Sequence, residues 1–448
     1  MVISSDIFMS FIPFSASQIL AFSAFLFLVY FFSSESIGIY LIDFSCYLPP
    51  ANLRVPAAHF IEHIEIADIF VKETIDFQTK VYERSSIGPQ SCLPLSVHQI
   101  PPDKSLNPSK AEVETVLFTV VKEILEKHKV NPKNIDILVS NCSIFCPTPS
   151  ITSMIINKFG FRSNVKSISL SGMGCSAGLI AISLAKDLLK VNRNSLALVL
   201  SMEAITPSGY EGKFKSFLLA NVLFRMGGVA VLLSNKSQDR KRSKYTIRHL
   251  CRTHMGSDDE SYKSVCQETD GSGLVGVSLS RNLLLVAGNA LKNNIRELAP
   301  HILPLNELIL AGLSIVRSKL LARKTEIYVP DFKRSKIRHF CIHAGGKAVV
   351  DAVQDKLRLS YGDGEASRMT LYRFGNTSSS SVWYELSYLE AKGRINKGDR
   401  VWQIAFGSGF KCNSAIWECI SELDPKLRNV WSDEINMYPV SIPEVADY

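Results

Sequence analysis

Apolar segments of strand length alternate with amphipathic segments of helix length, and this alternation restricts the fold more than any other feature of the sequence. The predicted strands cover residues 135–139, 165–170, 195–200, 228–233, 338–342 and 401–406. The predicted helices cover residues 110–129, 176–189, 284–298, 345–359 and 380–391. Strands buried on both faces read as short apolar runs. The alternation therefore predicts an α/β protein in which helices cover both faces of a sheet.

A long uncharged stretch lies at the N-terminus. No charged residue occurs from Ile7 to Ser34, and about 20 apolar helical residues are enough to cross the hydrocarbon core of a bilayer. A cleaved signal peptide is the alternative, but the stretch lacks a basic start and a small-residue cleavage site. Pro13 also allows a helix that bends back instead of spanning. Because Arg54 and Lys72 follow the stretch, we predict a membrane anchor whose following body faces the cytosol.

The charge balance argues against a nucleic-acid-binding protein. The 50 Lys and Arg residues exceed the 42 Asp and Glu residues by only 8 in a chain of 448. Basic residues are dense only at Lys236, Arg240, Lys241, Arg242, Lys244 and Arg248. We interpret this cluster as a solvated loop or strand edge. A surface for anionic lipid or for coenzyme A is the alternative.

The ten cysteines are scattered, which excludes a disulfide scaffold. Cys142 and Cys146 are the only close pair, and no second pair stands at zinc-finger spacing. Reduced thiols in a cytosolic setting fit this pattern.

The clearest candidate for chemistry is Cys175, in the segment Gly172-Met-Gly-Cys-Ser-Ala-Gly178 between a predicted strand and a predicted helix. Small neighbours allow a tight turn and the close approach of a substrate. A thiol in the first turn of a helix meets unpaired N–H groups and the positive end of the helix dipole. We therefore expect Cys175 to have thiolate character and to act as a nucleophile.

Two short patterns offer alternatives. Gly174-Cys-Ser-Ala-Gly178 also matches the nucleophile turn of an α/β-hydrolase, which would make Ser176 the nucleophile and His343 its base. His59-Phe-Ile-Glu-His63 matches an inverted zinc-protease motif. No third ligand is obvious near it, so we interpret this segment as a solvated amphipathic helix.

Three further clusters lie in the C-terminal third. His339-Phe-Cys-Ile-His343-Ala-Gly-Gly346 leads from a strand into a helix, as the Cys175 segment does, which hints at an internal duplication. Arg373-Phe-Gly-Asn376 begins a second polar turn, and Ala405-Phe-Gly-Ser408-Gly-Phe410 forms a glycine loop. Together with Cys175 these clusters supply a nucleophile, an imidazole, an amide donor and backbone N–H groups. A carbon–carbon-bond-forming acyltransferase needs this set.

At this point the sequence resembles the plant 3-ketoacyl-CoA synthases, the condensing enzymes of very-long-chain fatty acid elongation, which are chalcone-synthase-like members of the thiolase superfamily. The resemblance runs from Tyr40 to about Cys419 and includes the segments 141–150, 171–179, 223–228, 252–254, 339–346, 373–383 and 406–411. It implies an α/β, thiolase-like, duplicated five-layer fold with an N-terminal transmembrane anchor. It further implies an endoplasmic reticulum membrane location with the catalytic domain facing the cytosol, no metal and no bound cofactor.

The resemblance also implies a division of the chain. Residues 1–48 would form the membrane anchor and juxtamembrane segment. Residues 49–240 would form the N-terminal thiolase-like half with the nucleophilic cysteine, and residues 241–448 the C-terminal half with the histidine and asparagine.

The site residues follow from the same resemblance. It implies that Cys175 accepts the acyl group and that His343 and Asn376 complete a catalytic triad. The other activity-associated histidines of the family fall on His254 and His339. Backbone N–H groups of Cys175 and Ser408 are expected to hold the oxyanion.

One position departs from the family pattern. Four residues before Asn376, where the family commonly has histidine, this chain has Tyr372. Tyrosine can donate a hydrogen bond but cannot carry an imidazolium charge. The N-terminal region is also short for the two membrane spans usual in the family. A catalytically impaired member that acts as a scaffold for partner synthases is therefore the alternative to an active enzyme.

The expected reaction is a decarboxylating Claisen condensation. Malonyl-CoA and a long- or very-long-chain acyl-CoA would react through an acyl-cysteine and give 3-ketoacyl-CoA, CO2 and CoA. The expected partners are these two CoA thioesters, membrane lipid, a second copy of the chain in a homodimer, and the ketoacyl reductase, dehydratase and enoyl reductase of an elongase complex.

Overall fold

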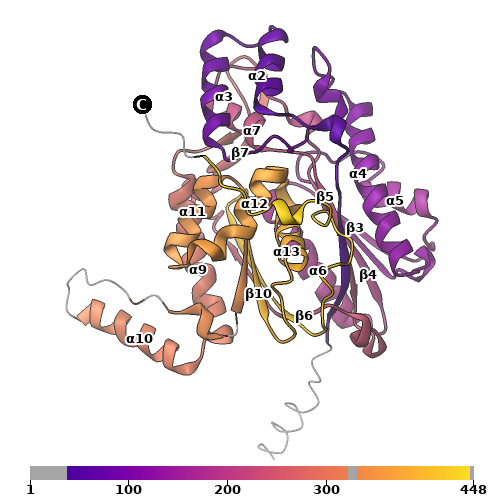
Figure 1. The fold of residues 1–448 in the computed structure, drawn as a ribbon, viewed down its shortest axis with the longest axis vertical. Coiled ribbons are helices and arrows are strands. Elements are labelled where there is room, and N and C mark those ends of the chain that lie inside the picture. The colour runs from indigo at the N-terminus through magenta and orange to yellow at the C-terminus, as the bar shows by residue number, and fades with distance from the viewer. Residues whose placement is uncertain (1–37, 321–327, 329, 336, 444–448) are drawn as a thin grey trace, which may run out of the picture. The chain divides into compact units, whose positions relative to one another are not determined.

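The computed structural model describes residues 38–320, 328, 330–335 and 337–443 (Figure 1). The predicted anchor at residues 7–34 lies outside this part of the chain. Among the described residues, no helix is both long enough and apolar enough to cross a membrane. From residue 39 onward, the described residues form one compact unit.

The predicted strands and helices are confirmed, and further elements lie between them. The strands are β1 (Tyr40–Cys46), β2 (Ile137–Asn141), β3 (Lys166–Leu170), β4 (Leu196–Met202), β5 (Gly228–Ser234), β6 (Tyr245–His254), β7 (Val265–Thr269), β8 (Val275–Leu279), β9 (Ile337–Ile342), β10 (Arg400–Gly407) and β11 (Lys411–Cys419). The helices are α2 (Ala57–Ile66), α3 (Lys72–Arg84), α4 (Leu106–Lys127), α5 (Ile151–Phe159), α6 (Ala177–Val191), α7 (Lys215–Leu223), α8 (Asp259–Tyr262), α9 (Leu283–Ile302), α10 (Leu305–Leu320), α11 (Lys347–Lys356), α12 (Glu365–Phe374) and α13 (Ser381–Ala391). Three of the short 3-10 helices matter below: η5 (Gly174–Ser176), η7 (Ser237–Arg242) and η10 (Ser378–Ser380).

Two similar groups of strands form the main sheet. Within the described residues its order is β3-β2-β4-β5-β1-β6-β11-β10-β9. In the N-terminal group, β2 is parallel to β4, β4 is antiparallel to β5, and β5 is antiparallel to β1. In the C-terminal group, β9 is parallel to β10, β10 is antiparallel to β11, and β11 is antiparallel to β6. The repeated pattern supports the internal duplication.

The helices form three layers around these strands. On the outside of the N-terminal half, α4 packs on β1, β4 and β5, and α5 packs on β2 and β3. On the outside of the C-terminal half, α9 packs on β6 and β11, with α11 beside it. Between the halves, α6 contacts β2, β4 and β11, while α13 contacts β9, β10 and β1. The order of helices, strands, inner helices, strands and helices gives the five layers that the resemblance implies.

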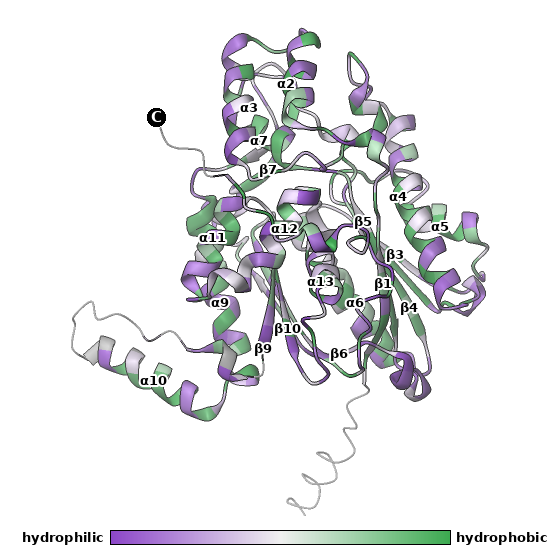
Figure 2. Cartoon of the chain, in the orientation of Figure 1, coloured by the Kyte–Doolittle hydropathy of each residue, from purple (hydrophilic) through white to green (hydrophobic). Residues whose placement is uncertain are grey.

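Hydropathy follows the layers. The strands β4 and β5 are buried along their whole length and are hydrophobic in Figure 2, whereas the outer helices α4 and α5 mix hydrophobic and hydrophilic residues. The inner helix α13 is buried at every position. A helix that is covered on all sides can place polar groups near a site without exposing them to water, which matters for the groups at its N-terminal end.

The duplication differs in register from the one that the sequence suggested. The turns at Cys175 and His343 are not equivalent, because Cys175 lies between β3 and α6, whereas His343 follows β9. The counterpart of α6 is α13, since each precedes the strand, β4 or β10, that is central to its half. The counterpart of Cys175 is thus the polar turn after Asn376. The turns at Cys175 and His343 both contain glycine, and this shared feature suggested the pairing that the structure corrects.

Residues 40–46 also differ from the expected juxtamembrane segment. They form β1, which pairs with β5 along its length and with β6 at Tyr40 and Leu41, where the two halves of the sheet meet. Burial of this strand was hidden in the sequence by Asp43, which is charged but only 1% exposed.

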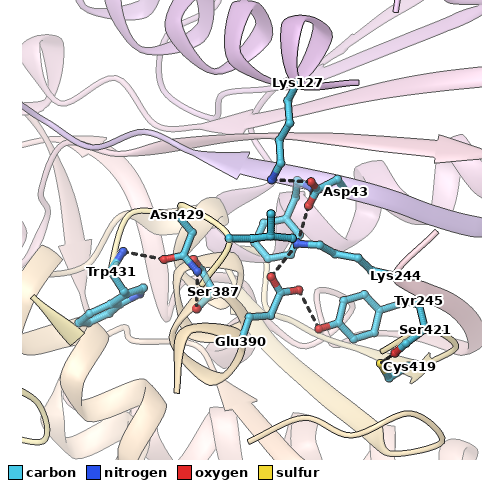
Figure 3. A network of polar contacts seen from close by, with 12 residues as sticks. Asp43, Lys127, Lys244, Tyr245, Ser387, Glu390, Cys419, Ser421, Asn429 and Trp431 are labelled. Carbon is cyan, nitrogen blue, oxygen red and sulfur yellow. Dashed lines mark hydrogen bonds and ion pairs between the residues drawn. The ribbon is translucent and has the colours of Figure 1, made fainter. Parts of the chain in front are cut away.

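An ion network explains how Asp43 is buried. Lys244 lies 2.7 Å from a carboxylate oxygen of Asp43 and 2.7 Å from one of Glu390, which is on α13 (Figure 3). Lys127 contacts Asp43 at 2.7 Å, and the Tyr245 hydroxyl donates to Glu390 at 2.8 Å. Burial alone would raise the pKa of Asp43, but the nearby Lys244, His128 and Lys127 together lower it. The network therefore connects β1 of one half to α13 of the other.

The basic cluster is largely accounted for by such pairs. Lys244 is internal, Arg248 contacts Glu418 at 2.8 Å, and Arg242 contacts Asp239 at 2.8 Å. Arg240 and Lys241 lie exposed on η7, and the partly buried Lys236 directly precedes it. This agrees with a solvated loop and strand edge. None of the six residues lines the main cavity of the protein.

Candidate active site

The main cavity, of about 830 Å³, lies where the two halves meet. Cys175 from the N-terminal half lines it together with His343, Asn376 and Ser408 from the C-terminal half. The structure thus brings together the four residues that the sequence singled out for the triad and the oxyanion. Residues of α3, α7, the β7–β8 hairpin and the start of α9 also line the cavity.

The turn at Cys175 depends on glycine. Gly172 and Gly174 have φ values of +68° and +66°, which are rarely adopted by residues with a side chain. A Cβ atom on Gly174 would lie 2.4 Å from the backbone nitrogen of Ser408. The absence of a side chain therefore lets the turn approach the Ser408 loop, so that Cys175 and the Ser408 backbone face the same cavity.

The expected thiolate character of Cys175 is not supported. Burial raises the pKa of the Cys175 thiol to about 12, although a hydrogen bond with the Ser378 side chain acts in the opposite direction. The cost of removing a charged sulfur from water exceeds the help given by the N-terminus of the helix. The thiol is therefore protonated at neutral pH, and a base must accept its proton when the sulfur attacks.

His343 has the properties of such a base. It follows β9, where its backbone N–H donates to the carbonyl of Ile404 at 2.9 Å. Its side chain is buried, with 4% exposed, and burial lowers its pKa to about 4. The ring is therefore neutral at physiological pH. Its Nδ1 atom lies 2.7 Å from the Ser381 hydroxyl at the start of α13.

Asn376 is held by hydrogen bonds from several directions. Its Nδ2 donates to the carbonyl of Gly345 at 3.2 Å, and its Oδ1 accepts from the backbone N–H of Ser378 at 2.8 Å. Its own backbone N–H donates to the carbonyl of Leu223 at 3.1 Å. A primary amide carries a second N–H. The geometry thus presents a fixed, neutral donor beside His343.

Sequence reasoning missed two polar residues that line the cavity. Glu203 accepts hydrogen bonds from the backbone N–H groups of Ser143 (3.0 Å) and Ile144 (2.9 Å), and holds the loop after β2 against the site. Burial raises its pKa. Ser378 has a φ of +56°, uncommon for a residue with a side chain, and its hydroxyl contacts Cys175. The run of four serines after Thr377 was the available signal for Ser378.

Three of the predicted residues lie outside the cavity lining. His254 is exposed at the end of β6, where its Nδ1 accepts from the N–H of Gly256 at 2.9 Å. His339 lies on β9, where its Nε2 atom is 3.3 Å from Asp399, and it does not line the cavity. Tyr372 packs on Gly88, whose N–H donates to the Tyr372 carbonyl at 2.7 Å. His254 lies beside Gly409 of the glycine loop, and Gly409 itself lines the cavity.

The two alternative motifs find no support in the geometry. Ser176 is fully buried beneath Gly407, does not line the cavity, and its hydroxyl has no partner among the described residues. His59 and His63 lie on the amphipathic helix α2, with ring centroids 6.4 Å apart. Within the described part of the chain, no group of three or more His, Cys, Asp or Glu side chains is placed to hold a metal ion.

Comparison with solved structures agrees with this fold. The C-terminal type III polyketide synthase domain of Steely1 from Dictyostelium superposes with a TM-score of 0.66 at 16% identity, covering 86% of this chain and 100% of that one. The 1,3,6,8-tetrahydroxynaphthalene synthase of Streptomyces coelicolor, also a type III polyketide synthase, gives a TM-score of 0.65 at 17% identity, covering 85% and 99%. At such identities the similarity establishes the thiolase-like fold alone.

Sequence comparison identifies the family. Residues 31–320 match the model for FAE1/type III polyketide synthase-like proteins, and residues 330–419 match the C-terminal model of 3-oxoacyl-[acyl-carrier-protein] synthase III. The chain is 57% identical to 3-ketoacyl-CoA synthase 7 of Arabidopsis thaliana over 411 residues, which cover 92% of this chain and 89% of that protein. It is 50% identical to 3-ketoacyl-CoA synthase 5 of the same plant, covering 93% and 84%. The chain therefore belongs to the FAE1/type III polyketide synthase-like family, as a condensing enzyme of the 3-ketoacyl-CoA synthase kind.

Proposed function

We propose that the main cavity joins a long- or very-long-chain acyl group to malonyl-CoA through a thioester on Cys175. The observation that carries this proposal is the meeting of a thiol, a neutral imidazole and a neutral amide in one cavity, contributed by both halves of the fold. The reaction uses two CoA thioesters as substrates and requires neither a bound cofactor nor a metal.

In the first half-reaction the Cys175 sulfur attacks the acyl-CoA carbonyl. Because the raised pKa keeps this thiol protonated, the proton passes to His343 as the carbon–sulfur bond forms. Backbone N–H groups of Cys175 and Ser408 stabilise the oxyanion. The bond to CoA then breaks, and CoA leaves as a thiolate that water protonates.

In the second half-reaction malonyl-CoA occupies the same cavity. Nε2 of His343, which keeps the proton taken from Cys175, and the Asn376 amide donate hydrogen bonds to its thioester oxygen, and loss of CO2 leaves an enolate held by these donors. Hydrogen bonds to developing charge are strong in a site that excludes water. The enolate carbon attacks the acyl carbonyl on Cys175, and the sulfur leaves and recovers its proton from His343. The product is a 3-ketoacyl-CoA two carbons longer than the acyl group.

The rest of the cavity lining suits both ends of an acyl-CoA. Cationic side chains line it at Lys80, Arg84, Arg281 and Lys347, and such groups attract phosphates. Apolar side chains line it at Phe77, Val81, Leu219, Val265, Val277, Leu279, Leu283 and Leu284. This arrangement supports recognition of CoA phosphates by the rim and of the acyl chain by the apolar wall. The basic cluster around Lys241 is not required for either.

A homodimer is part of the proposal. β3 forms one edge of the main sheet, and its first two residues, Lys166 and Ser167, are exposed. The unpaired backbone groups of an edge strand can pair with another chain. We further propose that the protein is anchored in the endoplasmic reticulum membrane with the cavity open to the cytosol, where the reductases and dehydratase of an elongase receive its product. Native mass measurement of the detergent-extracted chain tests the dimer.

Activity in yeast microsomes tests the proposed reaction. Labelled malonyl-CoA and acyl-CoAs of increasing length are supplied to the wild type, to Cys175→Ala and to Cys146→Ala, which removes an exposed thiol away from the cavity. We expect a labelled 3-ketoacyl product with the wild type and Cys146→Ala, and none with Cys175→Ala. The preferred acyl length follows from the same series.

Other outcomes point to the alternatives. Stable expression with no product at any chain length would favour the impaired scaffold. Activity that survives Cys175→Ala but not Ser176→Ala would favour the serine hydrolase. Tyr372 lies outside the cavity lining, so its replacement of histidine does not remove a group from the site.

A further inference from the structure

The hydrogen bond behind His343 connects its ring to the start of α13. Nδ1 of His343 lies 2.7 Å from Oγ of Ser381, and both residues are buried, with 4% and 0% exposed. Ser381 does not line the cavity, whereas His343 does. The serine therefore contacts the imidazole on the side away from the substrate.

A second bond of Ser381 fixes the direction of the first. The same Oγ donates to the backbone carbonyl of Ser378 at 3.0 Å. A serine hydroxyl has one hydrogen and two acceptor lone pairs. With that hydrogen on the Ser378 carbonyl, the bond to the ring is donated by Nδ1–H. Neutral imidazole carries one proton, so Nε2 is left with a lone pair.

The free nitrogen is on the side where a proton acceptor is needed. Gly345 also lines the cavity, and a Cβ atom there would lie 3.1 Å from Nε2 of His343. Glycine thus keeps the approach to Nε2 open. Ser378, whose carbonyl holds Ser381, contacts the Cys175 thiol through its own hydroxyl. The thiol and the imidazole are consequently contacted by two serines of one short segment, Ser378 and Ser381.

We propose that Ser381 is a positioning residue that holds His343 in the tautomer with its proton on Nδ1, and so makes Nε2 the base for Cys175. This inference rests on the proposed acyl transfer at Cys175. In the attack the S–H bond breaks and an Nε2–H bond forms, while sulfur bonds to the acyl carbon and the CoA thiolate leaves. The ring is then an imidazolium whose Nδ1–H still donates to Ser381. The proton returns to sulfur when condensation breaks the acyl–sulfur bond.

The neighbouring serine offers a matched control. Ser380 is also fully buried, and its hydroxyl donates to the carbonyl of Thr377, three residues earlier, at 2.9 Å. Ser381 makes the same kind of bond three residues back, to Ser378. The two serines therefore differ chiefly in that only Ser381 contacts the imidazole. Substitution to alanine removes the same backbone bond in each case.

The experiment measures the alkylation of Cys175 in the full chain. Wild type, Ser381→Ala, Ser381→Thr and Ser380→Ala are treated with iodoacetamide in detergent, and labelling of the Cys175 peptide is followed by mass spectrometry. Alkylation requires loss of the thiol proton but neither acyl-CoA nor malonyl-CoA. A hydrogen bond to a charged donor corresponds to a change of about 10- to 100-fold. We expect Ser381→Ala to slow labelling by about tenfold or more, Ser381→Thr to restore it, and Ser380→Ala to match the wild type.

A double-mutant cycle guards against a general packing effect. In a His343→Gln background, Ser381→Ala has no tautomer to control and should add no further slowing. Equal labelling of Ser381→Ala and Ser380→Ala, or the same slowing by Ser381→Ala with and without His343, would overturn the inference. Because labelling does not depend on the condensation, a wild type that labels as expected but forms no 3-ketoacyl product would count against the proposed function and not against the role of Ser381.

Discussion

The two halves of the fold share a strand pattern but contribute different chemistry. The N-terminal half supplies a thiol at the turn before its inner helix α6. The C-terminal half supplies an amide at the corresponding turn before α13, and an imidazole at the end of β9. Neither half alone holds the thiol, the imidazole and the amide together. The comparison teaches that the reactive groups belong to the junction, so their geometry depends on how firmly the halves are joined.

The halves also differ at their outer edges. In the N-terminal half α5 leads into β3, which extends the sheet, whereas in the C-terminal half α11 is followed by the helix α12 before α13 begins. Among the described residues, only the N-terminal half therefore continues the sheet by a further strand, β3, beyond the parallel pair β2 and β4. This open strand is directly connected to the Cys175 turn, which is why the proposed dimer contact and the nucleophile belong to the same half.

Removing the base from the C-terminal half should have the largest effect. We expect His343→Ala to slow both acylation of Cys175 and product formation by about 10²- to 10⁴-fold, the usual contribution of general acid–base catalysis. Single-turnover acylation with labelled acyl-CoA measures this. If acylation proceeds at the wild-type rate, the two halves do not cooperate in the first half-reaction.

Loosening the junction should reduce stability. Among the described residues, Lys244→Met leaves the buried Glu390 with the Tyr245 hydroxyl as its hydrogen-bond partner, while Asp43 keeps Lys127. Breaking a buried ion pair costs about 3–5 kcal/mol, whereas the exposed Lys241→Met should change stability by about 0.5 kcal/mol or less. Thermal unfolding compares the two. Equal unfolding temperatures would show that the network does not join the halves.

Replacing the amide should separate the two half-reactions. We expect Asn376→Ala to slow condensation by about 10²- to 10³-fold, as loss of one donor to an oxyanion does, while the Cys175 thiol and His343 remain in place. The acyl-enzyme should then accumulate when both substrates are present. Mass measurement of the trapped protein checks this. If Asn376→Ala slowed acylation as much as condensation, the assignment of Asn376 to the second half-reaction would be contradicted.

The glycine turn should show a smaller, graded effect. An L-residue in the left-handed region costs about 1–2 kcal/mol, and this applies to both Gly172→Ala and Gly174→Ala because their φ values are +68° and +66°. Only Gly174→Ala adds a clash, since its Cβ atom would lie 2.4 Å from the Ser408 nitrogen. Overpacking adds about 1–3 kcal/mol. In denaturant unfolding, Gly174→Ala should therefore have a lower free energy of unfolding than Gly172→Ala. The reverse order would contradict the close contact between Gly174 and the Ser408 loop.

The rate of Cys175 acylation should change little with pH near neutrality. The pKa of His343 is lowered to about 4 by burial, so the ring becomes unable to accept a proton only as the pH falls through about 4. The pKa of Cys175 is raised to about 12. Acylation should thus be level between about pH 5 and 8. A step near pH 6.5, the ordinary value for histidine, would show that the ring is solvated.

The sequence predicted the layers and the reacting groups, because both leave local signals. Apolar runs identified the strands that are buried on both faces, and glycine framing identified Cys175. The strands β1, β6 and β11 were missed because charged or polar residues interrupt them, such as Asp43, whose burial depends on Lys244 from a distant segment. No local pattern records such a pairing.

The same reason explains why the sequence could not show which polar residues line the cavity. His254 and His339 carry imidazoles and match the family, but neither lines the cavity. Glu203 and Ser381 acquire their roles only through contacts with residues 60 and 38 positions away. The protonated state of Cys175 likewise depends on burial, which the sequence around a helix start does not reveal.

Trapping the acyl-enzyme tests the meeting of the two halves most directly. The full chain is incubated with labelled long-chain acyl-CoA in the absence of malonyl-CoA, digested, and mapped by mass spectrometry. We expect one acyl group per chain, on the Cys175 peptide, which disappears when malonyl-CoA is added to the wild type but persists in Asn376→Ala. An acyl group on any other residue, or none on a folded chain, would contradict the division of chemistry between the halves.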